Sequence, residues 1–223
     1  MSNNRAQIRH DIRKARNNLS KNQQEIAAHS LKVNFIQYLK SMNSAKKSHI
    51  ALYLSNDGEL DTSLLINELW NTDQAIYLPI IHPFNGANLL FQRYEKNSPM
   101  RANRYGILEP KLNCSQICPL PELDYVLMPL VAFDKFGNRL GMGGGFYDRT
   151  LARLYEQHWQ QPQLIGLAHA CQQVDELPIE SSRNSGLPSE ANMSWKVGRW
   201  VAAGKLAVAG SIAPTGRSRL TST

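Results

Sequence analysis

The sequence predicts an α/β protein, a single layered domain with a mostly parallel central sheet flanked by helices. Short apolar segments alternate along the chain with longer segments of helical periodicity. One segment, "DYVLMPLVAF" (124–133), is almost continuously apolar, as expected for a strand that is buried on both faces. The length of 223 residues suits one domain, and a hydrophobic share of 42% is enough for a substantial core.

Each expected element has a local signal. Ile8 and Ile12, four residues apart, give the first helix an apolar stripe. Ser20 followed by Gln23 has the spacing of a capping box, which predicts that the second helix begins there. In chain order, the expected helices span about 5–17, 21–40, 62–70 and 146–160, and the expected strands span about 49–54, 74–81, 88–94, 124–133 and 163–170.

Residues 181–223 differ in composition from residues 1–180. The net charge is +7, yet residues 1–180 are nearly neutral, and the basic excess lies after Ser181. Small residues and glycines dominate there, and we expect no strand, so the chain divides into a domain of residues 1–180 and an atypical basic tail that is weakly folded. A frameshifted C-terminus and a divergent but functional one both fit this pattern.

Several classes of protein are disfavoured by the composition. The chain has no apolar run of about eighteen residues, so we expect no membrane span, and its polar N-terminus is unlike a secretion signal. Three cysteines form no disulfide framework, which favours a reducing, cytoplasmic location. The histidines and cysteines show no spacing typical of a zinc site.

The segment "NRLGMGGGFYDR" (138–149) carries the clearest chemical signal. It lies between an apolar strand and a helix start, where glycines let backbone N–H groups approach an anion and the helix N-terminus adds positive charge. Arg139 can donate two hydrogen bonds to a phosphate, and Asp148 can hold Mg²⁺. The spacing matches neither the Walker loop nor the dinucleotide fingerprint. A tight turn without a ligand is the alternative to a nucleotide phosphate site.

The longer segment "MPLVAFDKFGNRLGMGGGFYDRTL" resembles the signature of the 5-formyltetrahydrofolate cyclo-ligase family, also called 5,10-methenyltetrahydrofolate synthetases. Phe146 stands where the family has Tyr, and Gly144 stands where some members carry Lys, which gives Arg139 and Arg149 more weight as phosphate ligands. "RAQIRHDIRKARNNLS", "LYLSNDGELDT", "YGILEP" and "LIGLAHACQQVDELPIE" resemble other family segments in the same order. The resemblance covers about residues 5–180.

The resemblance implies a set of site residues. Arg139 and Tyr147 are expected to be catalytic, and Asp148 is expected to hold Mg²⁺. The family's further Mg²⁺ carboxylate cannot be assigned, because no Asp follows Glu180. The implied ATP-binding residues are Arg5, Arg9, Arg139, Leu140, Gly141, Met142, Gly143, Gly144, Gly145, Phe146 and Tyr147, and the implied folate-binding residues are Leu54, Glu59, Met142, Gly143, Gly144, Gly145 and Phe146.

The resemblance also implies the reaction. The formyl oxygen of 5-formyltetrahydrofolate attacks the γ-phosphate of ATP, N10 attacks the resulting phosphorylated imine, and phosphate leaves to give 5,10-methenyltetrahydrofolate. The implied partners are these small molecules, and the protein is expected to be a cytoplasmic monomer. A catalytically impaired, nucleotide-binding relative is the main alternative. Nucleic-acid binding through the tail, which contains Trp195 and Trp200, is disfavoured because the tail has no recognisable motif.

Overall fold

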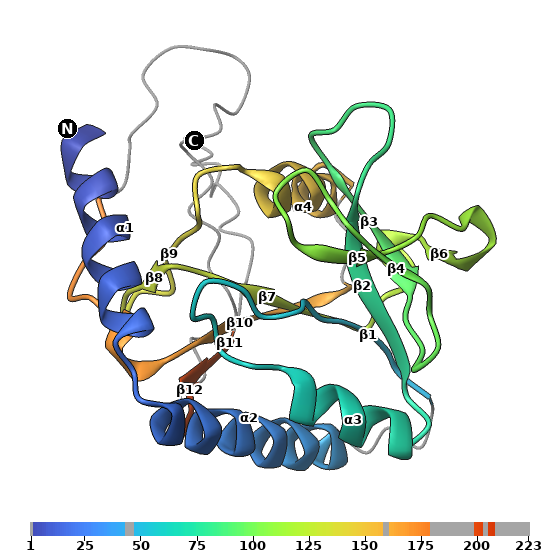
Figure 1. Cartoon of the computed structure of the whole chain (residues 1–223), viewed down its shortest axis with the longest axis horizontal. Helices are drawn as coiled ribbons and strands as arrows, with labels where there is room; N and C mark the ends of the chain where they lie inside the picture. Colours follow the sequence, from blue (N-terminus) through green and yellow to red (C-terminus); the bar gives the residue numbers. More distant parts are fainter. Residues whose placement is uncertain (1, 43–46, 158–160, 179–198, 203–204, 208–223) are drawn as a thin grey trace, which may run out of the picture.

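The computed structural model describes residues 2–42, 47–157, 161–178, 199–202 and 205–207 (Figure 1). Within these residues, an eight-stranded sheet has the order β12-β11-β10-β7-β1-β2-β3-β6. Its strands are β1 (His49–Ala51), β2 (Ala75–Ile81), β3 (Leu89–Arg93), β6 (Ile117–Cys118), β7 (Tyr125–Pro129), β10 (Gln163–Ala168), β11 (Arg199–Ala202) and β12 (Lys205–Ala207). Two small antiparallel ribbons pair β4 (Met100–Ala102) with β5 (Leu108–Pro110) and β8 (Ala132–Phe133) with β9 (Arg139–Leu140).

The middle of the sheet is parallel and its edges are antiparallel. Strands β11, β10, β7, β1 and β2 run parallel in that order. Strands β3, β6 and β12 pair in the antiparallel sense. Residues 125–128 of β7 are all buried, as the continuous apolar run predicts. The predicted class, a layered α/β domain with a mostly parallel sheet, is confirmed.

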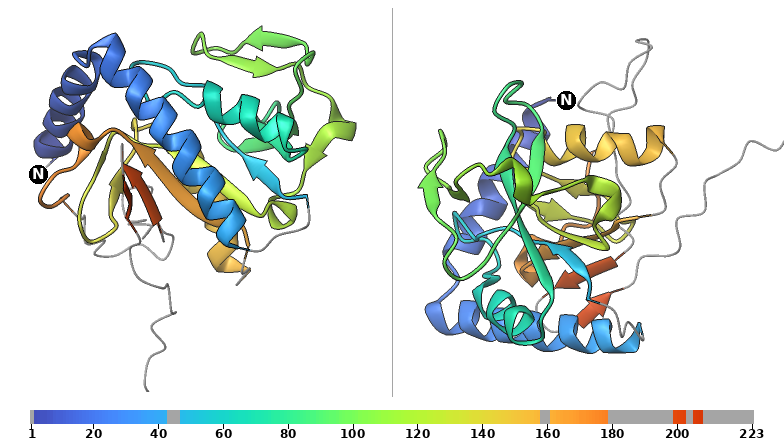
Figure 2. Two further views of the ribbon diagram at one scale, coloured as in Figure 1. Left: turned by 90° about the horizontal axis from the view of Figure 1, so that it is seen from below. Right: turned by 90° about the vertical axis from the view of Figure 1, so that its right-hand side faces the viewer.

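Helices lie on both faces of the sheet. The described helices are α1 (Ser2–Asn17), α2 (Lys21–Ser41), α3 (Ser63–Asn71) and α4 (Phe146–Glu156), with short 3₁₀ turns η1 (Cys114–Gln116), η2 (Leu120–Glu122) and η3 (Ala170–Gln172). Helices α2 and α3 pack on one face, through a cluster that includes Leu31 and Leu65, and α4 packs on the other through Leu151 (Figure 1, Figure 2). This sandwich leaves the carboxyl ends of β1 and β7 facing a region bordered by α1 and α4.

The N-terminal helices follow their sequence signals closely. Gln23 N–H donates to the Ser20 hydroxyl, and the Gln23 side chain accepts the Ser20 N–H, so the predicted capping box is present. Ile8 and Ile12 pack against a small cluster that contains Ala132 of the β8–β9 ribbon. Arg9 of the same helix reaches Gly141, 132 residues further along the chain, so α1 lies beside the glycine-rich segment.

The expected strand at 124–133 is wrong in its second half. Strand β7 ends at Pro129, and β8 folds back on β9 in a tight hairpin. The buried Asp134 carboxylate accepts the N–H groups of Phe136 and Asn138, and Gly137 has a φ of +88°. A side chain that captures turn amides favours reversal over continued extension. The glycine run thus follows a hairpin strand instead of the buried strand itself.

The expectation that the tail contains no strand is also wrong. Strand β11 pairs with β10 in parallel from Ile165↔Arg199 to Ala168↔Ala202, and β12 closes this side of the sheet. With four residues, β11 is too short to show a pattern of its own, and its pairing with β10 defines it as a strand. The remainder of the predicted tail, and residues 158–160 of the predicted fourth helix, lie outside the described residues.

Candidate active site

A cavity of about 460 Å³ lies beyond the carboxyl ends of β1, β2 and β7. This is where ligands bind in open parallel α/β sheets, because loops from neighbouring strands converge there. The cavity is lined by most of the residues singled out from the sequence, namely Leu54, Glu59, Arg139, Gly141, Met142, Gly144, Gly145, Phe146, Tyr147 and Asp148. The structure therefore gathers the glycine-rich segment and the 54–59 segment around one space.

The glycine-rich segment connects β9 to α4 along a path that only glycine adopts readily. Gly143 and Gly145 have φ angles of +102° and +64°, which residues with a side chain rarely adopt. A Cβ atom at Gly145 would lie 2.6 Å from the Arg149 guanidinium. Arg149 donates to the carbonyl oxygens of Gly144, at 2.6 Å, and Ala87, at 2.9 Å. These contacts hold the loop, so Arg149 supports the segment from behind its backbone.

Arg139 and Asp148, predicted to contact phosphate and Mg²⁺, form an ion pair with each other. The Arg139 guanidinium donates to the Asp148 carboxylate across the glycine-rich segment. Arg139 is buried, and within the described part of the chain its Nε has no hydrogen-bond partner. This ion pair connects the start of β9 to the first turn of α4. Both charged side chains line the cavity.

Leu140 faces away from the cavity. Successive side chains on a strand point to opposite sides, so Arg139 and Leu140 diverge. Leu140 is 1% exposed and packs with Ala132 and Leu177. Any contact between Leu140 and a nucleotide would come from its backbone.

Arg9 reaches the glycine-rich segment from α1, and Arg5 is its charged neighbour on that helix. The Arg9 Nε donates to the carbonyl oxygen of Gly141 at 2.8 Å. Its guanidinium lies about 3.8 Å from the position that a Cβ atom of Gly143 would take. Burial, and then the charge of neighbouring Arg5, lower the pKa of Arg9. Neither arginine lines the cavity described above, but Arg9 brings positive charge to its border through Gly141.

Burial changes the pKa of two polar groups at the cavity, Tyr147 and Glu59. The Tyr147 hydroxyl is buried, and no described residue forms a hydrogen bond with it. Burial, followed by the charge of Glu59, raises the pKa of Tyr147 far above its usual value, so the phenol keeps its proton. Burial also raises the pKa of Glu59 from 4.5 to about 7, although the N–H of Asn56 donates to its carboxylate at 3.1 Å. A neutral donor and a titrating carboxyl thus share one cavity.

The β4–β5 ribbon adds a wall that sequence reasoning did not assign. Tyr105 and Ile107, in the connection between the two strands, line the cavity. The Tyr105 ring meets the Phe146 ring edge to face, with centroids 5.8 Å apart. The family-like segment "YGILEP" contains both residues, but their contribution depends on how the ribbon folds over the sheet, which no local signal predicts.

The fold and this site define a class of protein. A cavity at the carboxyl ends of a parallel sheet, bordered by a glycine-rich turn before a helix and by arginines, is typical of α/β enzymes that act on phosphorylated small molecules. No described helix has the length and apolar character needed to cross a bilayer.

The comparisons with known proteins are consistent with this class and narrow it. The model of the 5-formyltetrahydrofolate cyclo-ligase family matches residues 1–184. The chain is 50% identical over 178 residues to the 5-formyltetrahydrofolate cyclo-ligase of Haemophilus influenzae, covering 79% of this chain and 91% of that one. It is 52% identical over 133 residues to the Escherichia coli K12 enzyme of the same name, covering 59% and 70%.

A solved structure agrees at the level of the fold. The 5,10-methenyltetrahydrofolate synthetase of Aquifex aeolicus superposes with a TM-score of 0.70 over 97% of this chain and 99% of that one, at 22% identity. The chain belongs to the 5-formyltetrahydrofolate cyclo-ligase family and is a ligase. The resemblance drawn from the glycine-rich signature is confirmed.

Proposed function

We propose that the cavity converts 5-formyltetrahydrofolate to 5,10-methenyltetrahydrofolate, with ATP converted to ADP and phosphate. The observation that carries this placement is the buried Tyr147 hydroxyl, which has no described partner and lies beside Glu59 and the glycine-rich segment. A buried hydroxyl without a partner is costly, by about 1–3 kcal/mol, unless a ligand satisfies it. The comparisons give no support to the alternative of an impaired relative.

The reaction needs positioning more than covalent help from the protein. The formyl oxygen attacks the γ-phosphorus, and the bond between that phosphorus and ADP breaks. N10 then attacks the activated carbon, its proton is released, and phosphate departs with the former formyl oxygen. Both steps depend on holding the two substrates in line and on neutralising phosphate charge. The cavity offers arginine donors and backbone amides for this purpose, and no nucleophile is required.

We assign the two substrates to opposite walls. The glycine-rich segment from Gly141 to Gly145 and Arg9 of α1 suit the triphosphate, because a guanidinium lies against a glycine-rich turn before a helix. The wall formed by Leu54, Glu59 and Phe146 suits the folate, since it combines apolar surface with a carboxyl. Met142 and the glycines belong to the triphosphate wall, and we propose that the folate contacts them as well where the two walls meet.

Mg²⁺ fits this arrangement through one carboxylate. Among the described residues no group of three or more His, Cys, Asp or Glu could hold a metal ion by itself. Asp148 lines the cavity in the first turn of α4. Mg²⁺ is often bound by one or two carboxylates together with substrate phosphates and water, so Asp148 would hold it beside the triphosphate. There the metal would neutralise phosphate charge.

We also propose that the enzyme works in the cytoplasm as a monomer. Cys114, Cys118 and Cys171 are free thiols, which agrees with a reducing compartment.

The proposal is tested by substrate-dependent turnover. ATP hydrolysis is expected to require 5-formyltetrahydrofolate, with unformylated tetrahydrofolate as the control. Tyr147→Phe is expected to lower kcat/KM about tenfold or more without lowering the thermal unfolding midpoint, because the lost hydroxyl has a partner only in the complex. Equal kinetics of Tyr147→Phe and wild type would remove Tyr147 from the site. Magnesium dependence that is unchanged in Asp148→Asn would remove the metal assignment.

A further inference from the structure

A fully buried arginine in α1 touches several segments of the site at once. Arg16 is 0% exposed, which is rare for this residue type. Its Nε donates to the carbonyl oxygen of Asp57 at 2.7 Å, and its Nη2 donates to the Asp57 carboxylate at 2.8 Å. Its Nη1 lies 3.4 Å from the carbonyl oxygen of Leu130, directly after β7, and its Nη2 lies 3.9 Å from the Met142 sulfur.

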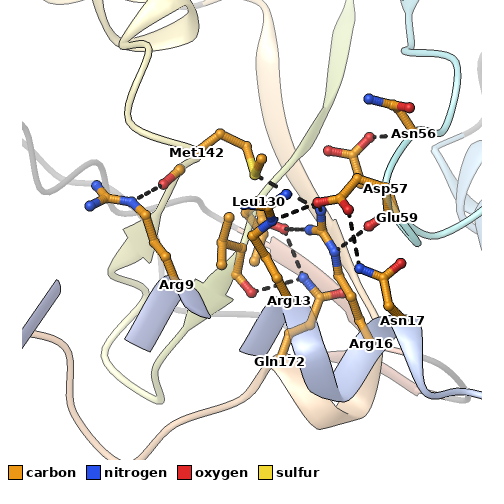
Figure 3. A network of polar contacts seen from close by, with 12 residues as sticks. Arg9, Arg13, Arg16, Asn17, Asn56, Asp57, Glu59, Leu130, Met142 and Gln172 are labelled. Carbon is orange, nitrogen blue, oxygen red and sulfur yellow. Dashed lines mark hydrogen bonds and ion pairs between the residues drawn. The ribbon is translucent and has the colours of Figure 1, made fainter. Parts of the chain in front are cut away.

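These contacts converge from three parts of the chain, as Figure 3 shows. Asp57 belongs to the loop that carries Glu59, and Met142 belongs to the glycine-rich segment. About two helical turns before Arg16, Arg9 donates a hydrogen bond to the carbonyl oxygen of Gly141. Helix α1 therefore reaches the proposed folate wall and the proposed triphosphate wall together, and Arg16 is the described side chain that contacts both the 56–59 loop and Met142.

The 56–59 loop is shaped to receive this helix. Asp57 and Gly58 have φ angles of +50° and +71°, a path that is strained at Asp57. A Cβ atom at Gly58 would lie 2.4 Å from the Asn17 side chain, so the loop backbone is flush against α1. Hydrogen bonds from Arg13, and then from Asn17 and Arg16, lower the pKa of the Asp57 carboxyl to about 2. Contacts with α1 thus add to the hydrogen bonds within the loop, between Asn56 and Glu59, in fixing its conformation.

We propose that Arg16 is a positioning residue of the ligase reaction. Its side chain fixes the 56–59 loop, which carries Glu59, relative to Met142 in the glycine-rich segment. This inference rests on the proposed placement of the substrates on the two walls. A fork of donors is needed, because one guanidinium satisfies the Asp57 carbonyl, the Asp57 carboxylate and the end of β7. Lysine keeps the charge but cannot hold these acceptors in one plane.

Arg13 provides a matched control on the same helix. It also donates to the Asp57 carboxylate, at 2.7 Å, but its side chain is 46% exposed. Among the described residues, Arg13 forms no hydrogen bond with Leu130 or Met142. Arg13→Met removes one of the hydrogen bonds to the Asp57 carboxylate, and the contact of Arg16 with Met142 stays. The change therefore removes an exposed ion pair, which contributes little to stability.

The experiment compares Arg16→Lys, Arg16→Met and Arg13→Met in the full chain. For Arg16→Lys, kcat/KM for 5-formyltetrahydrofolate is expected to fall about tenfold or more, the usual effect of losing hydrogen bonds to a charged group. Arg13→Met is expected to stay within about fivefold of wild type. Ile66→Val, a buried change in α3, controls for lost stability and is expected to keep wild-type kinetics.

The pH profile gives a second readout. Burial is the main cause that raises the pKa of Glu59, and the positive charge of Arg16 opposes it. Arg16→Met is therefore expected to move the Glu59 inflection in kcat/KM to higher pH, whereas Arg16→Lys leaves it near the wild-type value. The charges of Arg16 and Asp57 act on Glu59, and the Glu59 charge acts on Tyr53 and Tyr147. His169 interacts with the Glu59 backbone.

The outcomes separate this inference from the proposed function. Kinetics of Arg16→Lys that match those of Arg13→Met, or an Ile66→Val variant as impaired as Arg16→Lys, would overturn the positioning role. A wild-type chain without formyl-folate-dependent ATP hydrolysis would overturn the proposed function itself. If Arg16→Met does not fold, Arg16→Lys alone decides the question through its kinetics.

Discussion

Two polar atoms at the site are buried without a described partner: the Tyr147 hydroxyl and the Arg139 Nε. Each such group destabilises the free protein by about 1–3 kcal/mol. A ligand that accepts or donates a hydrogen bond there would recover this free energy. The groups are therefore poised to bind substrate at the expense of stability, as is common for active sites.

Arg139→Ala is expected to weaken the use of ATP. One charge-assisted contact to phosphate contributes roughly 1.5–3 kcal/mol, so kcat/KM for ATP should fall about ten- to hundredfold. Steady-state rates against ATP concentration provide the measurement. Arg153→Ala, an exposed change later in α4, serves as the control and should behave as wild type. If Arg139→Ala retains wild-type rates at every ATP concentration, the phosphate assignment fails.

Glu59 should make the stability depend on pH. Its pKa is raised by burial from 4.5 in the unfolded chain to about 7 in the folded one. The folded state then binds the proton more tightly, so this contribution to stability is complete below pH 4.5 and is lost as the pH rises through 7. Glu59→Gln removes the effect. Denaturant unfolding of the two proteins from pH 4 to 8 should show wild type losing stability relative to the variant, and parallel curves would contradict the assignment.

At the scale of elements, the β8–β9 hairpin and the turn into α4 determine the site. The hairpin returns the chain so that Arg139 faces Asp148, and the glycines then lead into the helix with α1 alongside. Positive φ angles at Gly143 and Gly145 are part of that path. A side chain at either position conflicts with the backbone conformation and, at Gly145, with Arg149.

Gly143→Val and Gly145→Val are expected to fold and to bind ATP at least about tenfold more weakly, because strain and bulk displace the loop amides. Calorimetric titration with nucleotide measures the affinity, and circular dichroism checks the fold. Gly141→Ala is the control for stability, since its backbone is unstrained and an added Cβ atom would meet Arg139 at an ordinary 3.9 Å. Wild-type affinity in both valine variants would mean that the segment is only a turn.

At the scale of the whole molecule, the sheet depends on the end of the chain. Strand β11 covers the edge of β10, whose residues from Leu164 to Ala168 include several that are almost fully buried. An uncovered, apolar, buried strand is a site of aggregation as well as of lost hydrogen bonds.

Truncation before Ser181 is therefore expected to lower the thermal unfolding midpoint, by about 2–4 °C for each kcal/mol lost, and to promote aggregation. Hydrogen exchange of the β10 amides should accelerate in the truncated chain, while amides of β2 on the far side of β1 change less. A truncated chain with unchanged midpoint, exchange and activity would show that β11 and β12 are dispensable.

The sequence by itself determined the class of fold and the family, and most of the site residues that it predicted line the cavity. Periodicity and capping are local, so the helices at Ile8 and Ser20 could be predicted, and the glycine-rich signature could be matched because its spacing is contiguous. The tertiary structure alone decided that β7 ends at Pro129, that β11 joins the sheet, and that Arg16 meets Asp57 and Met142. The contacts of Arg16, for example, are with residues 41 and 126 positions away in the sequence. No local pattern encodes which distant segment will satisfy a buried donor.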